Sequence, residues 1–142
     1  MRLTRSICVM MPIVAAACSN GLTAPPNELP VTLSIIEPAG GGLPSQSIAG
    51  AGDSVQAVVV SLGGVCGAAP TAAAGLRANK LVMTITTVVA DRPCLEIAAF
   101  QIYAITAREV PPGTRVALVD LHIVNGKTAT DSVLISKSIT LP

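Results

Sequence analysis

The fold class is decided by the stretch at residues 115–141, RVALVDLHIVNGKTATDSVLISKSITL. In its first half apolar side chains occupy every second position, as in a β-strand with one buried face. The Asn125-Gly126 pair is the strongest hairpin signal in the chain, because both residues tolerate the positive φ of a type I′ turn. Residues 127–141 are therefore expected to return as the last strand, with a break near Asp131.

The rest of the chain repeats this pattern of short apolar runs between Gly and Pro residues. Stretch 37–52 is expected to be loop, and the small-residue stretch 63–78 to be a loop or one helical turn. No long amphipathic helix is expected. Strands are expected upstream of residue 115 at 31–36, 53–62, 79–90 and 94–108. Six or seven strands with such turns predict an antiparallel β-sandwich.

Two stretches carry a family resemblance. GDSVQAVVV at residues 52–60 resembles the second strand of bacterial immunoglobulin-like domains. VPPGTRVALVDL at residues 110–121 resembles the turn and following strand of many secreted β-sandwich modules. The resemblance implies an all-β, antiparallel, immunoglobulin-like β-sandwich of six or seven strands over residues 31–142.

The N-terminus has the layout of a signal peptide. Arg2 and Arg5 precede an apolar run of about twelve residues, which is shorter than the ~20 residues that span a bilayer as a helix. Three alanines at residues 15–17 lead directly into Cys18. This arrangement resembles a bacterial lipoprotein signal, which implies cleavage before Cys18 and attachment of a lipid to its thiol.

That resemblance divides the chain into three parts. Residues 1–17 are expected to be the cleaved signal peptide, residues 18–30 the lipidated cysteine with a flexible tether, and residues 31–142 the β-sandwich domain. The alternative is an ordinary signal peptidase site at the alanines, which leaves Cys18 as a free thiol. Lipidation is favoured, because a free thiol is an awkward state in an oxidising compartment.

The remaining cysteines favour a disulfide. Cys8 lies in the signal peptide, so Cys66 and Cys94 are left to pair with each other. Such a bond closes a loop of about 29 residues and contributes on the order of 3.5 kcal/mol of stability. A redox or metal-binding pair is the alternative, but the spacing is not CxxC and no histidine lies nearby in sequence. No metal is therefore expected.

Composition excludes some classes of function. The formal net charge is +1 and charged residues make up 12% of the chain, without any run of like charge. Nucleic-acid binding is not expected, because phosphate contacts need clustered Lys and Arg. The Gly-rich stretches lack the pattern of a phosphate-binding loop, so no cofactor is expected either.

One polar group on a predicted strand raises the question of catalysis. His122 is the only histidine, and Asp120 lies on the same face of the strand, about 7 Å away. A hydrolase would need Ser132 or Ser136 as its nucleophile, and the favoured interpretation is a solvated strand face. Lys137 falls on the same strand face as apolar residues of the last strand. It is either a charge that protects an edge strand against aggregation or the sign of a β-bulge that shifts the alternation of side chains.

These features predict a non-catalytic, lipid-anchored protein of the bacterial cell envelope, with its domain in the periplasm or at the cell surface. The expected role is structural or protein-binding (adhesive), through a protein partner or self-association, and the membrane is contacted through the lipid. The alternative is a carrier of a small apolar ligand in a sandwich or barrel cavity.

Overall fold

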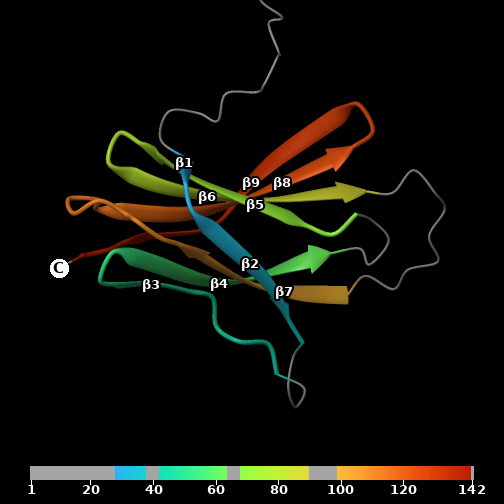
Figure 1. Ribbon diagram of the computed structural model, residues 1–142. Coiled ribbons are helices and arrows are strands. Elements are labelled where there is room, and N and C mark those ends of the chain that lie inside the picture. The colour runs from blue at the N-terminus through green and yellow to red at the C-terminus, as the bar shows by residue number, and fades with distance from the viewer. Residues whose placement is uncertain (1–27, 38–41, 64–67, 90–98, 142) are drawn as a thin grey trace, which may run out of the picture.

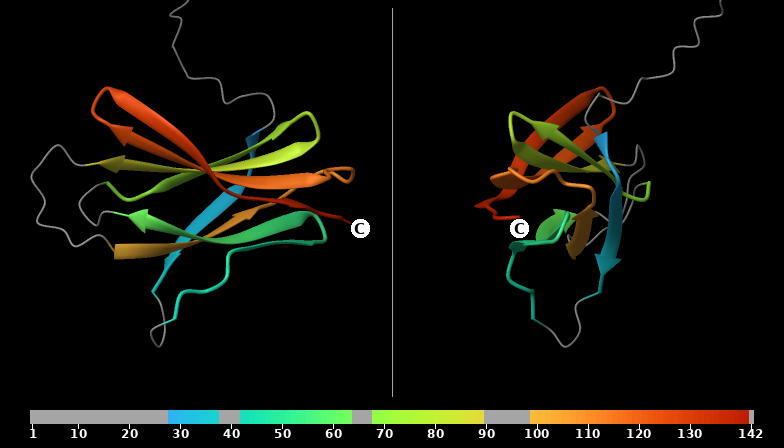
Figure 2. Two further views of the ribbon diagram at one scale, coloured as in Figure 1. Left: turned by 180° about the vertical axis from the view of Figure 1, so that it is seen from behind. Right: turned by 60° about the vertical axis from the view of Figure 1, so that its left-hand side comes forward.

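The computed structural model describes residues 28–37, 42–63, 68–89 and 99–141, and these residues form β-strands and no helix (Figure 1). The strands make two sheets that face each other as layers (Figure 2). The predicted all-β, sandwich-like fold is confirmed. The predicted signal peptide and the three cysteines with predicted roles, Cys18, Cys66 and Cys94, lie outside the described residues.

The two sheets differ in size. Within the described residues, sheet A has five strands in the order β1 (Glu28–Leu29), β5 (Thr71–Arg77), β6 (Lys80–Val89), β8 (Val116–Asn125) and β9 (Thr128–Ser138). Sheet B has four, in the order β2 (Val31–Ile36), β7 (Ala99–Ala107), β4 (Ser54–Gly63) and β3 (Ser47–Ala51). The described part of the chain thus holds nine strands, where six or seven were expected.

The additional strands lie in stretches that were expected to be loop or tether. β3 falls within residues 37–52, β5 within residues 63–78, and the short β1 just before residue 31. β3 and β5 consist mainly of Ser, Ala and Gly, which give little alternation between apolar and polar positions. Their backbones instead pair with the longer strands β4 and β6. The loop or helical turn predicted for 63–78 is therefore wrong at residues 71–77.

One strand pair departs from the predicted antiparallel arrangement. Among the described strands six of the seven pairs are antiparallel, but β6 and β8 are parallel. The chain leaves sheet A after β6, runs through sheet B as β7, and returns as β8 in the direction of β6. Parallel neighbours need such a crossover, and here a strand of the facing sheet supplies it instead of a helix.

The core lies between the sheets and is aliphatic apart from one ring. Tyr103 is fully buried, and its hydroxyl donates a hydrogen bond to Oε1 of Gln101. Burial raises the pKa of Tyr103. The largest other side chains of the core cluster that are fully buried are Ile48, Leu81, Met83, Ile85, Ile105, Val55, Val59, Val110 and Val119.

Both lateral edges of the sandwich are bridged between the sheets. On one side Pro30 separates β1 of sheet A from β2 of sheet B, and its carbonyl accepts a hydrogen bond of 2.9 Å from the Arg108 amide. On the other side Nζ of Lys137 in β9 donates to the carbonyl of Ile48 in β3, at 3.1 Å. The ammonium of Lys137 therefore links the edge strands of the two sheets.

Candidate binding groove

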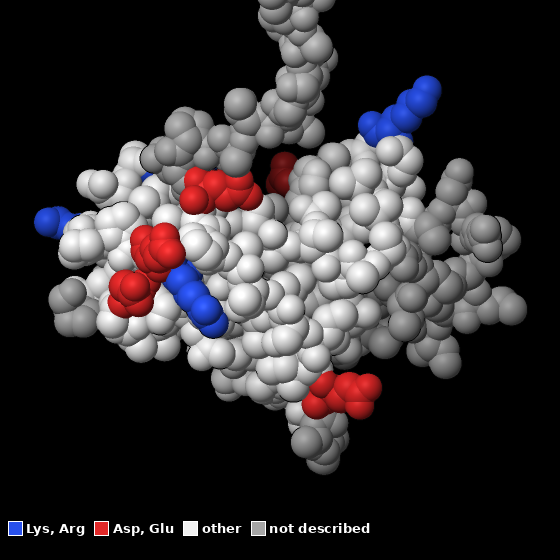
Figure 3. All heavy atoms as spheres, viewed as in Figure 1, with Lys and Arg blue, Asp and Glu red and all other residues white. Residues whose placement is uncertain are grey.

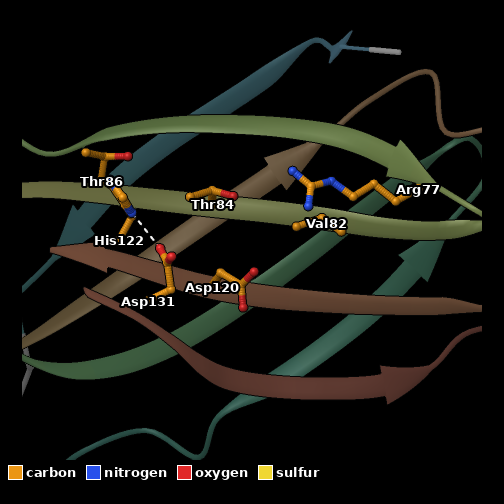
Figure 4. Close-up of a pocket in the computed structure, with 7 residues that line it drawn as sticks. All are labelled: Arg77, Val82, Thr84, Thr86, Asp120, His122 and Asp131. Atoms are coloured by element: carbon orange, nitrogen blue, oxygen red, sulfur yellow. Dashed lines mark hydrogen bonds and ion pairs between the residues drawn. The ribbon is translucent and has the colours of Figure 1, made fainter. Parts of the chain in front are cut away.

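The outer face of sheet A carries an open groove of about 380 Å³ (Figure 4). Four neighbouring strands, β5, β6, β8 and β9, contribute to it. Its lining residues are Arg77, Val82, Thr84, Thr86, Asp120, His122 and Asp131. The parallel pairing of β6 with β8 sets the two threonines beside Asp120 and His122 respectively, so the unexpected strand direction decides which side chains meet here.

Small side chains on β5 keep one side of the groove low. Ala73 lies opposite Thr84, and Gly75 lies opposite Val82, all on the outer face. Arg77 is the one long side chain that β5 presents on this face, and it extends over the groove from the end of the strand (Figure 4). The Ala-rich stretch is thus the strand that leaves this side of the groove open.

The β8–β9 hairpin brings His122 and Asp131 together. Nδ1 of His122 lies 2.5 Å from Oδ1 of Asp131, and the two residues are directly opposite each other in the strand pairing. Both side chains reach solvent, with 31% of the histidine and 73% of the aspartate exposed. This is a surface ion pair when the imidazole is protonated, and such pairs contribute little to stability.

The turn of this hairpin lies one residue further along than the sequence predicted. Asn125 pairs with Thr128, so Gly126 and Lys127 are the two turn residues. Gly126 has a φ of 58°, whereas Asn125 and Lys127 do not adopt positive φ. A positive φ at the first turn residue alone fits a type II′ turn, which takes Gly there, and not the predicted type I′ turn.

A β-bulge in β9 determines which of its residues face the groove. The pairing of β8 with β9 shifts between Val119 and Asp120, which leaves Leu134 as an extra residue on β9. Before the bulge Asp131 faces outward, and beyond it the phase is reset so that Lys137 reaches sheet B. The bulge interpretation of Lys137 is confirmed, and its strand is also an edge strand.

Asp120 is the partly buried carboxylate of the groove. Burial raises the pKa of Asp120, and the negative charge of Asp131 raises it further, while Arg77 acts in the opposite direction. Among the described residues, no side-chain hydrogen bond or ion pair is formed by Asp120 or Arg77. The groove therefore contains a carboxylate and a guanidinium that line the same space without pairing.

The candidates from sequence are only partly brought together. Asp120 and His122 share the outer face as predicted, but the histidine pairs with Asp131 instead. Ser132 pairs with a buried leucine of β8 and lies on the core side of the sheet. In the described part of the chain neither Ser132 nor Ser136 hydrogen-bonds to His122. The arrangement expected of a hydrolase is not formed by these residues.

Within residues 28–37, 42–63, 68–89 and 99–141, no three His, Cys, Asp or Glu side chains are grouped to hold a metal ion. The same residues contain no helix that is long and apolar enough to span a bilayer.

Comparison with protein-family models, with curated proteins and with solved structures finds no match to this chain. The part of the chain that the structure describes is all-β, with two sheets and an open polar groove on one outer face.

Proposed function

We propose that this protein is a non-catalytic binding module of the bacterial cell envelope, and that the outer face of sheet A is its surface for a protein partner. The groove on that face carries the proposal. It combines charged and hydroxyl side chains with Val82, while Val133 beside it is 63% exposed. Protein interfaces characteristically combine apolar contact with a few well-placed polar groups.

The low overall charge supports this choice of surface. Only 12% of the residues are charged, and in the view of Figure 3 charged side chains are few on the described surface. Three of the twelve charged residues in the described part of the chain, Arg77, Asp120 and Asp131, line one groove. These three charges of both signs gather around one groove, which supports the choice of this face for binding.

We infer the membrane anchor from the N-terminal sequence. The resemblance of residues 1–18 to a lipoprotein signal supports a lipid on Cys18, with the domain in the periplasm or at the cell surface. The resemblance of residues 52–60 and 110–121 supports an immunoglobulin-like type of sandwich. The Cys66–Cys94 disulfide stays a prediction that suits this oxidising location.

The alternative functions receive less support. A carrier of a small apolar ligand needs an aliphatic-lined cavity. The groove described above lies outside the sandwich and contains charged and hydroxyl groups, which favours a polar surface contact instead. His122 has Asp131 as its partner and no hydroxyl partner among the described residues, which favours binding over hydrolysis.

Site-specific photo-crosslinking in cells tests the binding face. A crosslinking amino acid at Val133, beside the groove, is expected to capture a partner. The matched position Gln56, exposed on the outer face of sheet B, is expected to capture none. Equal capture from both positions, or capture from neither, would contradict the proposal. Capture of a second copy of this chain would mean that this face mediates self-association and does not bind a different protein.

Intact mass of the membrane-extracted protein tests the anchor separately. The expected mass corresponds to a chain beginning at Cys18 with acyl groups attached. The variant Cys18→Ala is expected to lose the added mass and the membrane association, because acyl chains contribute about 0.8 kcal/mol per buried methylene. An unacylated wild-type chain would contradict the anchor and leave the binding face to its own test.

A further inference from the structure

We propose that the groove on sheet A binds a ligand that carries one positive and one negative charge, the cation between Asp120 and Asp131 and the anion at Arg77. This inference rests on the proposed binding role of that face and names the chemistry of what it binds. The occupant is an extended protein segment that carries one basic and one acidic side chain, in keeping with the protein partner proposed for this face.

The placement of opposite charges across one strand is the first support. Arg77 comes from β5 and Asp120 from β8, and β6 lies between these strands. Their side chains line the same groove but form no ion pair with each other among the described contacts. A ligand lying across β6 can therefore reach both charges at once, and neither charge has to be released from a partner within the described residues.

The second support is the uneven balance of charge across the groove. Asp120 and Asp131 lie on the β8–β9 side, whereas the guanidinium of Arg77 is on the β5 side (Figure 4). Burial raises the pKa of Asp120, and the negative charge of Asp131, which also contacts His122, raises it further, as is expected where two carboxylates repel each other. A cation between them relieves this repulsion, while a second anion there adds to it.

The floor between the charges suits an organic ligand. Val82, Thr84 and Thr86 present methyl groups and hydroxyls from consecutive outward positions of β6. Hydroxyls both donate and accept hydrogen bonds, so this floor accommodates a peptide backbone or a short aliphatic chain. The volume of about 380 Å³ lies at the lower end of the range for small-ligand sites, and the groove is open to solvent, so an extended chain can continue beyond it.

An NMR titration of the full chain with defined probes tests the inference. The blocked peptide acetyl-Lys-Gly-Glu-amide presents both charges on one side of an extended backbone. It is expected to shift the signals of Val82, Thr84 and Asp120. Replacing either its Lys or its Glu by Gln is expected to weaken binding by about two- to fivefold, the equivalent of one surface charge contact. A single-charge peptide that binds as tightly as the parent would overturn the proposal.

Protein variants assign each charge to its side of the groove. Arg77→Gln is expected to weaken the parent peptide and to leave the peptide that lacks Glu unaffected. Asp120→Asn is expected to weaken every probe that carries Lys and to leave the peptide that lacks Lys unaffected. The matched control Arg108→Gln removes an exposed arginine that does not line the groove, and it is expected to change nothing. An equal effect of Arg77→Gln and Arg108→Gln would overturn the assignment.

A last arm tests the protein segment as the occupant. The small zwitterion 6-aminohexanoic acid is expected to bind more weakly than the peptide, because it lacks the backbone of a protein segment. Equal binding of the two probes would overturn the protein segment as the occupant, and binding of neither probe would overturn the doubly charged ligand altogether. A partner crosslinked at Val133 would in that case still support the binding face, so the two proposals fail separately.

Discussion

The outer faces of the two sheets share the same alternation of side chains but differ in what they expose. On sheet B, Ile102 lies on the side of β7 away from the core residue Tyr103, and yet it is only 1% exposed. On sheet A, the central positions of the outer face carry Thr84 and Asp120, which line an open groove. One outer face thus covers an apolar side chain, and the other leaves polar side chains accessible.

The neighbouring strands differ at these two positions. The strand register flanks Ile102 with Ile36 on one side and Val60 on the other. Thr84 instead has Ala73 as its neighbour on β5. Ile102 is thus flanked by branched apolar side chains on both sides, whereas Thr84 lies between a small side chain and Asp120. Alternation within a single strand does not reveal this difference.

The variant Ile102→Ala is expected to produce the largest loss of stability among the outward positions. Truncating a buried isoleucine costs about 2–5 kcal/mol, because apolar burial is lost and a cavity remains. The matched variant Val82→Ala, on the outer face of sheet A, is expected to cost about 1 kcal/mol or less, since Val82 lines an open groove. Urea unfolding of both variants measures the free energies. Equal losses would mean that the two faces are covered alike.

The general architecture was predictable because long strands with one buried face show a clear alternation of apolar and polar residues. In β6 and β8 the apolar residues recur at every second position, and Leu81, Met83 and Val119 are buried as this pattern requires. β5 was missed because Ala and Gly give no such pattern. The parallel direction of β8 was missed because it depends on the route of the chain through the other sheet, which no local pattern encodes.

The site was half predictable for a different reason. Asp120 and His122 were expected on one face, since two residues separated by one always share a strand face. The partner Asp131 was missed because the turn was placed at Asn125-Gly126, and counting back from there sets His122 opposite Ala129. The observed turn is one residue later, and the same count then reaches Asp131. A one-residue error in a turn thus changes the composition of a site.

The variant Gly126→Ala tests how strongly that turn holds the open face of sheet A together. Gly126 has a φ of 58°, and a Cβ there would meet no atom within 4 Å, so the cost is that of the backbone alone. A loss of about 1 kcal/mol is expected, because L-residues disfavour the left-handed region. Gly42→Ala is the matched control, since a Cβ there also meets open space and its φ is not positive. Thermal unfolding measures both, and equal midpoints would contradict the role of the turn.

Asp120 gives the open face a small dependence on pH. Its pKa is raised above the ordinary value of 3.8 in the folded state, mainly by burial, so folding favours the protonated carboxyl. The stability that it contributes is fully present below pH 3.8 and is lost as the pH rises through the raised folded-state pKa. The variant Asp120→Asn is therefore expected to be more stable than wild type at pH 7, by about 0.5 kcal/mol or less, as is usual for surface positions.

Denaturant unfolding at pH 3 and pH 7 measures this difference. The advantage of Asp120→Asn should shrink at pH 3, where the wild-type carboxyl is protonated in both states. The matched variant Glu37→Gln, at an exposed position away from the groove, is expected to show no such change with pH. An advantage of Asp120→Asn that is the same at both pH values would contradict the electrostatic explanation.

The contact between His122 and Asp131 is expected to have the smallest effect on stability, although it is the closest polar contact of the groove. Asp131 is 73% exposed, and solvent screens its attraction for the imidazole, so a double-mutant cycle with His122→Ala and Asp131→Ala should give a coupling of about 0.5 kcal/mol or less. The hairpin register determines which residue faces Asp131. A hairpin turning at Asn125-Gly126 would set Asp120 opposite Asp131, and these two like charges would repel each other. A coupling well above 1 kcal/mol would mean that solvent does not screen this contact. The groove would then be a rigid, internally paired surface, and its open position would be weaker support for a role in binding.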